Sequence, residues 1–493
     1  MPQDPEARAP ATTTAATPGK IIDMTSDLVI IGGGATGIGA ARAARAKGAE
    51  VVLVERGRVG GDCTFTGCIP SKTMIEAAKR GDDFATAMAK VHQAVEHVAA
   101  SESAEVLRQE GIDVREGTAR FAGPHTVEVD GTAVLARAVV IATGANPLVP
   151  PIPGIETVEY RTNETLFDLT SLPKSLAVLG GGPIGVEMAQ AFARLGSVVT
   201  IVEGADRLLP REEALASATL QNVFTHFGID VRTGTTLERV ERIDGETSIR
   251  LHLSEGSQVE TDVLLVAVGR TPATFGLGLE EAGVRVDREG FVQVDSRLRT
   301  SARGVFAAGD VAEPLQFTHV AYETGRIAAL NALARVPVHR FRPEAVPWVT
   351  FTDPEVARVG RTESEAAARG GRVAFLPMSE LDRAITAGRT EGFVKIITGP
   401  RTILRGTAGG RILGATIVSP RAGEVIHELV LAMRTRMFPA RLALTTHAYP
   451  TWSMAVQQAA AQFFGEFDGR TARPASATSA DQEMRQSGED GAA

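Results

Sequence analysis

The two cysteines of this 493-residue chain, Cys63 and Cys68, both lie in the segment GGDCTFTGCIPSK. Pro70 follows them at a position typical of the first turn of a helix. A thiol near a helix N-terminus has a lowered pKa, so its thiolate is populated at neutral pH and can attack a disulfide or reduce a bound group. We therefore predict that Cys63 and Cys68 form a redox-active pair.

A cysteine pair of this kind could also form a structural disulfide or bind a metal. In a cytosolic protein such a pair is usually catalytic rather than structural. No neighbouring His or third Cys completes a set of metal ligands. A total of two cysteines also excludes disulfide frameworks and zinc or iron–sulfur sites built from four cysteines. Redox chemistry is the favoured interpretation, and we expect no resident metal.

Two segments, residues 27–55 and 176–203, repeat one pattern. Each begins as an apolar strand, passes through Gly-x-Gly-x-x-Gly into an Ala-rich helix, and ends in a β-branched strand that closes with Glu. In such a unit the first glycine allows a tight turn, the second admits a pyrophosphate and the third lets the helix pack on the strand. The helix N-terminus faces the diphosphate, and the Glu accepts hydrogen bonds from a ribose. We predict two dinucleotide sites, one at Gly32, Gly34, Gly37 and Glu55 and one at Gly180, Gly182, Gly185 and Glu203.

Other segments extend these units into domains. Residues 136–147, 263–272 and 303–312 are apolar runs that end in or near glycine, as expected where a chain passes between domains. From about Arg342 the pattern alternates like antiparallel strands, and a helix follows. The predicted fold class is α/β, with two Rossmann-like dinucleotide-binding domains and a C-terminal α+β domain. We expect the charged stretch at 355–365 to be a solvated face.

Composition limits the partners and the location of the protein. Lys and Arg number 51 and Asp and Glu 59, a formal net charge of −8, which is unsuited to a nucleic-acid partner. No window reaches the roughly 18 uncharged apolar residues of a membrane span, and the N-terminus lacks the apolar core of a signal peptide. We expect a cytoplasmic protein without membrane association. The polar ends, residues 1–24 and 468–493, are expected to be disordered.

Seven motifs occur in one order over residues 27–467: GGGATG, GGDCTFTGCIPSK, ATGANP, GGGPIGVEMA, AVGRTP, AAGDVA and HAYPT. In this set the chain resembles the FAD-dependent pyridine nucleotide–disulfide oxidoreductases, the family that includes dihydrolipoamide dehydrogenase, glutathione reductase and mercuric reductase. The resemblance implies FAD binding by residues 25–150 and 273–341, and NAD(P) binding by residues 151–272. It also implies that residues 342–467 are an interface domain that forms a homodimer.

The resemblance also assigns roles to single residues. Cys68 would lie against the flavin as a thiolate, and Cys63 would be the interchange thiol that meets the substrate. Lys72 and Glu187 would form an ion pair near the reactive edge of the flavin; an ordinary surface Lys and helix Glu are the alternative. Asp310 would bind the ribityl chain of FAD. The same motifs place Lys72, Thr143, Gly144 and Gly269 among the cofactor-binding residues.

Glu203 indicates which nicotinamide nucleotide the second site takes. A carboxylate suits a free 2′-hydroxyl and repels a 2′-phosphate, so NADH is favoured. Arg207 and Arg211 follow closely in the sequence and keep NADPH as the alternative.

The C-terminal motif departs from the family pattern. Dihydrolipoamide dehydrogenase and glutathione reductase have His-Pro-Thr there, with a Glu that orients the acid–base His, whereas this chain reads HAYPTWSM. Tyr449 stands in place of the His, and Met454 in place of the Glu. Tyr is a poor base at neutral pH but its hydroxyl can donate a proton. His447 could substitute as the acid–base group, with a packing or loop role as the alternative.

Mercuric reductase also lacks this His, and GGDC, LDRAITAGRTEGFVK and Tyr449 bring the chain closer to that branch. The usual mercuric reductase has a further C-terminal Cys pair, which is missing here, so Hg(II) would bind transiently at Cys63 and Cys68. We predict that two electrons pass from NAD(P)H through FAD and the thiol pair to a metal ion, a small disulfide or another electrophile. The alternatives are dihydrolipoamide dehydrogenase-like activity, a quinone reductase or diaphorase with non-essential thiols, and a non-catalytic redox sensor.

Overall fold

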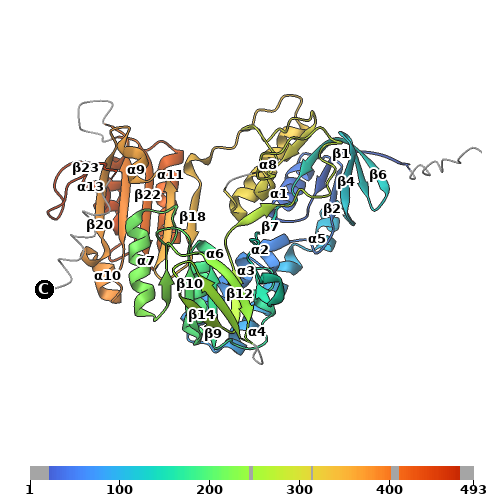
Figure 1. Ribbon diagram of the computed structural model, residues 1–493. Coiled ribbons are helices and arrows are strands. Elements are labelled where there is room, and N and C mark those ends of the chain that lie inside the picture. Colours follow the sequence, from blue (N-terminus) through green and yellow to red (C-terminus); the bar gives the residue numbers. More distant parts are fainter. Residues whose placement is uncertain (1–20, 244–247, 313–314, 401–409, 478–493) are drawn as a thin grey trace, which may run out of the picture.

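The computed structural model describes residues 21–243, 248–312, 315–400 and 410–477. Three sheet-centred parts make up the fold, and the second part, drawn in green, lies between the first part, in blue, and the C-terminal part, in orange (Figure 1). The segments expected to be disordered lie outside the described residues over 1–20 and 478–493. No helix in the described part of the chain is long and apolar enough to cross a membrane.

The first sheet has five parallel strands in the order β3-β2-β1-β6-β17, the order of a Rossmann unit. Leu28, Val29 and Ile30 of its central strand are fully buried, because parallel strands are covered on both faces. A hairpin, β4 and β5, extends β6. The strands are β1 (Ile21–Ile31), β2 (Val51–Glu55), β3 (Asp113–Glu116), β4 (Ala119–Gly123), β5 (Thr126–Val129), β6 (Thr132–Ile141) and β17 (Val305–Ala307), and the covering helices are α1 (Ala35–Arg45) and α8 (Thr318–Leu333).

The second sheet repeats this architecture, with the all-parallel order β11-β10-β9-β15-β8. Its first helix, α6 (Pro183–Leu195), begins with Pro and ends at Gly196 in the left-handed conformation, the residue types that favour those two ends. A small antiparallel sheet is attached to it. The remaining elements are β8 (Tyr160–Arg161), β9 (Ser175–Leu179), β10 (Val198–Val202), β11 (Asp230–Arg232), β12 (Leu237–Arg242), β13 (Ile249–Leu253), β14 (Gln258–Thr261), β15 (Val263–Val266) and α7 (Ala214–His226).

Two short antiparallel strands, β7 (Ala145–Pro147) and β16 (Arg270–Pro272), join the first two parts where the chain leaves the first sheet and where it returns. The cysteine segment precedes both strands in the sequence and forms α2 (Gly61–Phe65) and α3 (Cys68–Lys79). Met74 of α3 and Phe84 of the next helix share one buried cluster with Phe192 of α6. The cysteine helices therefore pack against the second dinucleotide unit. Two more helices follow, α4 (Phe84–Ser101) and α5 (Ala104–Gln109).

The C-terminal part is a six-stranded antiparallel sheet in the order β18-β19-β22-β21-β20-β23. The alternating segments predicted from about Arg342 are confirmed as its strands, and the predicted helix as α11. Together with the two Rossmann-like parts, this sheet gives the predicted fold class. The elements are β18 (Pro347–Thr350), β19 (Glu355–Gly360), β20 (Arg372–Pro377), β21 (Phe393–Thr398), β22 (Ile412–Ser419), β23 (Arg473–Pro474), α9 (Glu363–Ala367), α10 (Asp382–Ala387), α11 (Ala422–Arg434), α12 (Pro439–Leu444) and α13 (Met454–Ala461).

The charged stretch at 355–365 is not a solvated face, so that prediction is wrong. Glu363 is fully buried, and its Oε2 lies 3.0 Å from Nζ of Lys395, which is 1% exposed. Arg473 of β23 also pairs with Glu363. This pair folds part of the predicted disordered tail onto β20, and residues 21–24 at the other end belong to β1. At both ends, residues predicted to be disordered are thus part of a strand, because they pair with strands that are remote in the sequence.

The buried charges predict a large difference between two Glu substitutions. Glu363→Ala removes the carboxylate that lies 3.0 Å from the buried Lys395 ammonium, so the free energy of unfolding should fall by about 3 kcal/mol. Glu96→Ala breaks an exposed pair with Arg58 and should cost less than about 1 kcal/mol. Urea unfolding of both variants measures the difference, and equal losses would contradict the prediction.

Candidate active site

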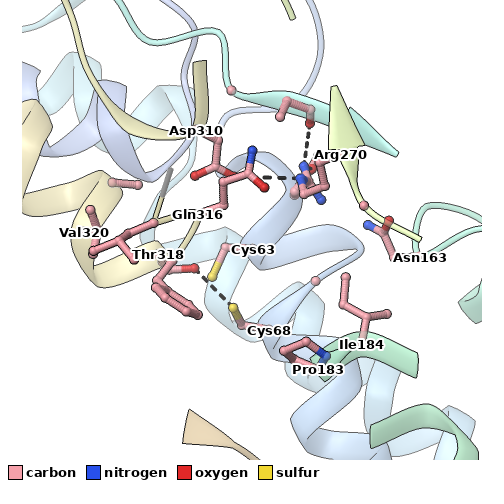
Figure 2. A pocket seen from close by; sticks show the side chains of 18 of the residues that line it. Cys63, Cys68, Asn163, Pro183, Ile184, Arg270, Asp310, Gln316, Thr318 and Val320 are labelled. Carbon is pink, nitrogen blue, oxygen red and sulfur yellow. Dashed lines mark hydrogen bonds and ion pairs between the residues drawn. The ribbon is translucent and has the colours of Figure 1, made fainter. Parts of the chain in front are cut away.

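The two thiols lie at the start of adjacent helices. Cys63 is in α2, Cys68 is the first residue of α3, and both are partly buried free thiols. Cys68 Sγ lies 3.1 Å from Oγ1 of Thr318, the first residue of α8 (Figure 2). Helices from two distant parts of the chain therefore meet at this sulfur.

The surroundings make the two thiols different acids. Hydrogen bonds from Cys63 and Thr318 and the positive charge of Lys72 outweigh burial and lower the pKa of Cys68 to about 6. The pKa of Cys63 is raised, because its proton is shared with the Cys68 sulfur and because it is buried. Cys68 is therefore the thiolate of the pair at neutral pH, and Cys63 keeps its proton.

The expected ion pair between Lys72 and Glu187 is present. Lys72 Nζ lies 2.7 Å from Glu187 Oε2, which joins α3 to α6. Burial opposes the charge of Lys72, but the charge and hydrogen bond of Glu187 raise the pKa of the ammonium group above its usual value. Lys72 thus stays protonated next to the Cys68 sulfur, and its charge is one cause of the lowered thiol pKa.

The two Gly-x-Gly-x-x-Gly turns have the same geometry. A Cβ on Gly37 would lie 1.9 Å from the carbonyl oxygen of Gly32, and one on Gly185 would lie 1.9 Å from that of Gly180. Both third glycines are therefore required where the helix crosses the turn. A Cβ on Gly182 would meet no protein atom within 4 Å, so protein packing leaves that face open to a ligand.

The polar groups of both turns suit a diphosphate and a ribose. No side chain caps the N-terminus of α1 or α6, so the first backbone N–H groups are available to an anion. Glu55 accepts hydrogen bonds from the backbone N–H of Gly33, at 2.6 Å, and Gly57, at 2.7 Å. Glu203 is held in the same way by Gly181 and Ala205, at 2.5 and 2.7 Å. Each carboxylate is thus oriented at the end of its strand.

One continuous cavity of about 2250 Å³ connects the two turns and the thiols. Most of the residues predicted from the sequence line it, which brings them into one site. Gly37 and Gly185 are internal packing residues instead. The predicted residues that line the cavity are Gly32, Gly34, Glu55, Cys63, Cys68, Lys72, Thr143, Gly144, Gly180, Gly182, Glu187, Glu203, Gly269 and Asp310.

The lining contains buried polar groups near the thiols. The Oγ1 of Thr143 is buried without a hydrogen-bond partner in the described part of the chain. Asp310 is mostly buried, which raises its pKa, and Nε of Arg270 lies 3.8 Å from its carboxylate (Figure 2). Arg270 also binds Asp62 of α2. The Thr143 hydroxyl and the Asp310 carboxylate therefore suit the binding of a polar cofactor between the first sheet and the thiols.

Tyr449 and His447 lie outside this cavity in the single chain. The Tyr449 side chain is well exposed, and a hydrogen bond from its hydroxyl to Asp382 raises the pKa of the phenol. His447 is held by the carbonyl of Thr445, at 2.8 Å, and by Glu428, at 3.2 Å. One chain therefore does not bring either of the two predicted acid–base residues to its own thiols.

Sequence reasoning missed three contributors to the site: Thr318, Phe351 and Arg270. Arg270 belongs to the motif AVGRTP and Thr318 follows the motif AAGDVA by a few residues, so both motifs could have drawn attention to them. Phe351 carries no motif signal, and it enters the site because its N–H binds Glu187 at 2.8 Å.

Comparisons with known proteins agree with this geometry. Residues 26–325 match the family described as pyridine nucleotide-disulphide oxidoreductase, and residues 346–460 match its dimerisation domain. Dihydrolipoyl dehydrogenase of Thermus scotoductus is 37% identical over 88% of this chain and 97% of its own length. Mercuric reductase of Streptomyces lividans is 38% identical over 89% and 96%. The Cu(II) complex of the HOCl-induced flavoprotein disulfide reductase RclA from Escherichia coli superposes with a TM-score of 0.82 and 32% identity, over 89% of this chain and 99% of that one.

The Thr318 contact predicts a shift in the acidity of Cys68. In a Cys63→Ser background Cys68 is the only thiol of the chain, so a pH titration of thiolate absorbance reports on it alone. Thr318→Val removes a hydroxyl donor and should raise the pKa of Cys68 by about one unit, which lowers the thiolate fraction at pH 7. Thr318→Ser keeps the donor and should restore the parent curve. Identical titrations of the Val and Ser variants would contradict the assignment.

Proposed function

The chain belongs to the pyridine nucleotide–disulphide oxidoreductase family, and we propose that its thiol pair delivers electrons to an acceptor that needs no histidine base. It is a flavoprotein oxidoreductase, an FAD-dependent enzyme that uses NAD(P)H and a redox-active disulfide. The proposal concerns which residues act, which nucleotide is preferred and what accepts the electrons.

Bound FAD would relay two electrons from the nicotinamide to the Cys63–Cys68 disulfide. Two electrons and one proton cleave the disulfide to a thiol and a thiolate. Cys63 keeps the proton and Cys68 carries the negative charge, in line with the opposite directions of their pKa shifts. Lys72, held by Glu187, keeps a positive charge beside that thiolate. Cys63 is then the thiol that meets the acceptor.

The observation that decides the proposed acceptor is the absence of a histidine base at position 449. Tyr449 replaces the family's His, and its raised pKa keeps the phenol protonated, so it can donate a proton but cannot remove one at neutral pH. His447 is bound to Glu428 and Thr445. A thiophilic metal ion such as Hg(II) binds two sulfurs without a base, and a small electrophile or disulfide is the second class of acceptor. Dihydrolipoamide dehydrogenase-like and quinone reductase activities are the alternatives.

A homodimer fits this proposal. The match of residues 346–460 to a dimerisation domain supports it. Since Tyr449 and His447 lie outside the thiol cavity of their own chain, either would reach a pair of thiols only in a second copy.

We infer that NADH is preferred over NADPH. Glu203 lines the cavity as an oriented carboxylate at the end of β10, where a 2′-phosphate would be repelled. Arg207 is engaged by the carbonyl of Pro210, at 3.1 Å, and by Asp206. Arg211 also lines the cavity and is the residue that could accommodate a phosphate.

An acceptor panel tests the function of the thiols. With NADH as donor, turnover of Hg(II) should exceed turnover of a lipoamide-type disulfide, and Cys63→Ser should lower Hg(II) turnover by about 100-fold or more, because a single sulfur cannot complete the two-electron pair. Quinone turnover serves as the control for flavin reduction alone. Full retention of Hg(II) turnover by Cys63→Ser would establish the diaphorase alternative, and faster lipoamide reduction would establish the dehydrogenase alternative.

The nucleotide preference has its own test. Glu203→Gln keeps an acceptor oxygen but removes the charge, so the ratio of kcat/KM for NADH over NADPH should fall by about ten-fold, equivalent to about 1.4 kcal/mol. Glu55→Gln makes the matched change in the first unit and should leave that ratio unchanged. An unchanged ratio in Glu203→Gln would contradict the role of Glu203.

A further inference from the structure

One face of α6 holds the segment that follows β18 in the C-terminal part. Glu187, Gln190 and Arg194 are spaced one turn apart and therefore share this face. Gln190 and Asp353 exchange two hydrogen bonds, of 2.7 and 2.8 Å, through the backbone of Asp353. Arg194 pairs with the Asp353 carboxylate at 2.6 Å. The segment is thus fixed to the helix that carries Glu187.

Glu187 divides its carboxylate between two partners. Oε2 binds Lys72 Nζ at 2.7 Å, and Oε1 accepts the backbone N–H of Phe351 at 2.8 Å. The Glu187 side chain is only 4% exposed, so both bonds form where water competes little. The Phe351 N–H therefore fixes the orientation of the carboxylate that positions Lys72.

The ring of Phe351 contacts the other partner of the same ion pair. Lys72 Nζ lies 4.8 Å from the ring centroid, within the range of a cation–π interaction. Phe351 also packs against the buried cluster that α3 and α6 share, which restricts the ring. One residue of the C-terminal part thus contacts both members of the Lys72–Glu187 pair.

We propose that Phe351 is a positioning residue for the redox-active thiol: its N–H orients Glu187, its ring holds Lys72, and through them it sets how strongly Lys72 stabilises the Cys68 thiolate. The inference rests on the proposed function, in which that thiolate takes part. It links the C-terminal part to the reactivity of the thiols of the same chain.

The groups that face Cys68 come from four helices. They are the Cys63 thiol on α2, Lys72 on α3, Glu187 on α6 and the Thr318 hydroxyl on α8. Among them Lys72 is the only cation, and it lowers the pKa of Cys68 while Glu187 raises it. Weaker placement of Lys72 must therefore raise the pKa of Cys68 and leave less thiolate at a given pH.

The test is the pH dependence of iodoacetamide alkylation of the flavin-loaded protein in a Cys63→Ser background, where Cys68 is the only thiol. Phe351→Leu removes the ring face and should raise the apparent pKa of Cys68 by about 0.5, about a three-fold loss in the ratio of thiolate to thiol. Phe351→Tyr keeps the ring face and should restore the parent value. If Phe351→Leu does not fold, Phe351→Met carries the same expectation.

Phe375→Leu is the matched control. Phe375 packs against the same buried cluster, and its ring faces Arg470, at 5.9 Å, instead of Lys72. This variant should lose packing without a shift in the apparent pKa of Cys68. Equal pKa values for the parent, Phe351→Leu and Phe375→Leu proteins would overturn the proposal, as would equal shifts in both variants. Because alkylation needs neither nicotinamide nor acceptor, this result is independent of whether the proposed electron acceptor is correct.

Discussion

A thiolate in a partly buried site is the constraint on which the arrangement of this protein depends. Burial alone would raise the pKa of Cys68, so the charge persists only where donors and a cation surround the sulfur. Cys63 and Thr318 supply the donors and Lys72 supplies the cation, from three different helices. The helices must therefore be held in register by contacts between the parts of the chain that carry them.

Those contacts are charged and they join the parts of the chain. Glu187 connects α3 to α6 and to the C-terminal part, and Asp353 binds Arg194 and Arg389. Glu212 binds Arg358 at 2.8 Å and the indole N–H of Trp348 at 2.6 Å. Buried ion pairs of this kind add little net stability, but a single lost partner is costly. Their effect here is to define how the second dinucleotide unit meets the C-terminal sheet.

Much of the site was predictable because its chemistry is local in sequence. Tight turns, helix N-termini and a terminal Glu lie within one strand–helix–strand unit, so a short segment such as residues 27–55 defines a dinucleotide cradle almost completely. The same holds for Cys63 and Cys68, whose spacing and following Pro70 already indicated a helix entry. The burial of Glu363 was not predictable, because a charged stretch normally faces solvent and its cations stand 32 and 110 residues further along the chain.

The sequence by itself determined the two nucleotide cradles, the redox pair and the departure at Tyr449, since each depends on residue types at short spacing. Only the tertiary structure decided that Thr318 donates to the Cys68 sulfur and that Phe351 contacts the Lys72–Glu187 pair. Thr318 is 250 residues from Cys68, and Phe351 is 164 residues from Glu187. Electrostatic and hydrogen-bond effects act over a few ångströms in space, and only the packing of the helices brings such distant residues within that range.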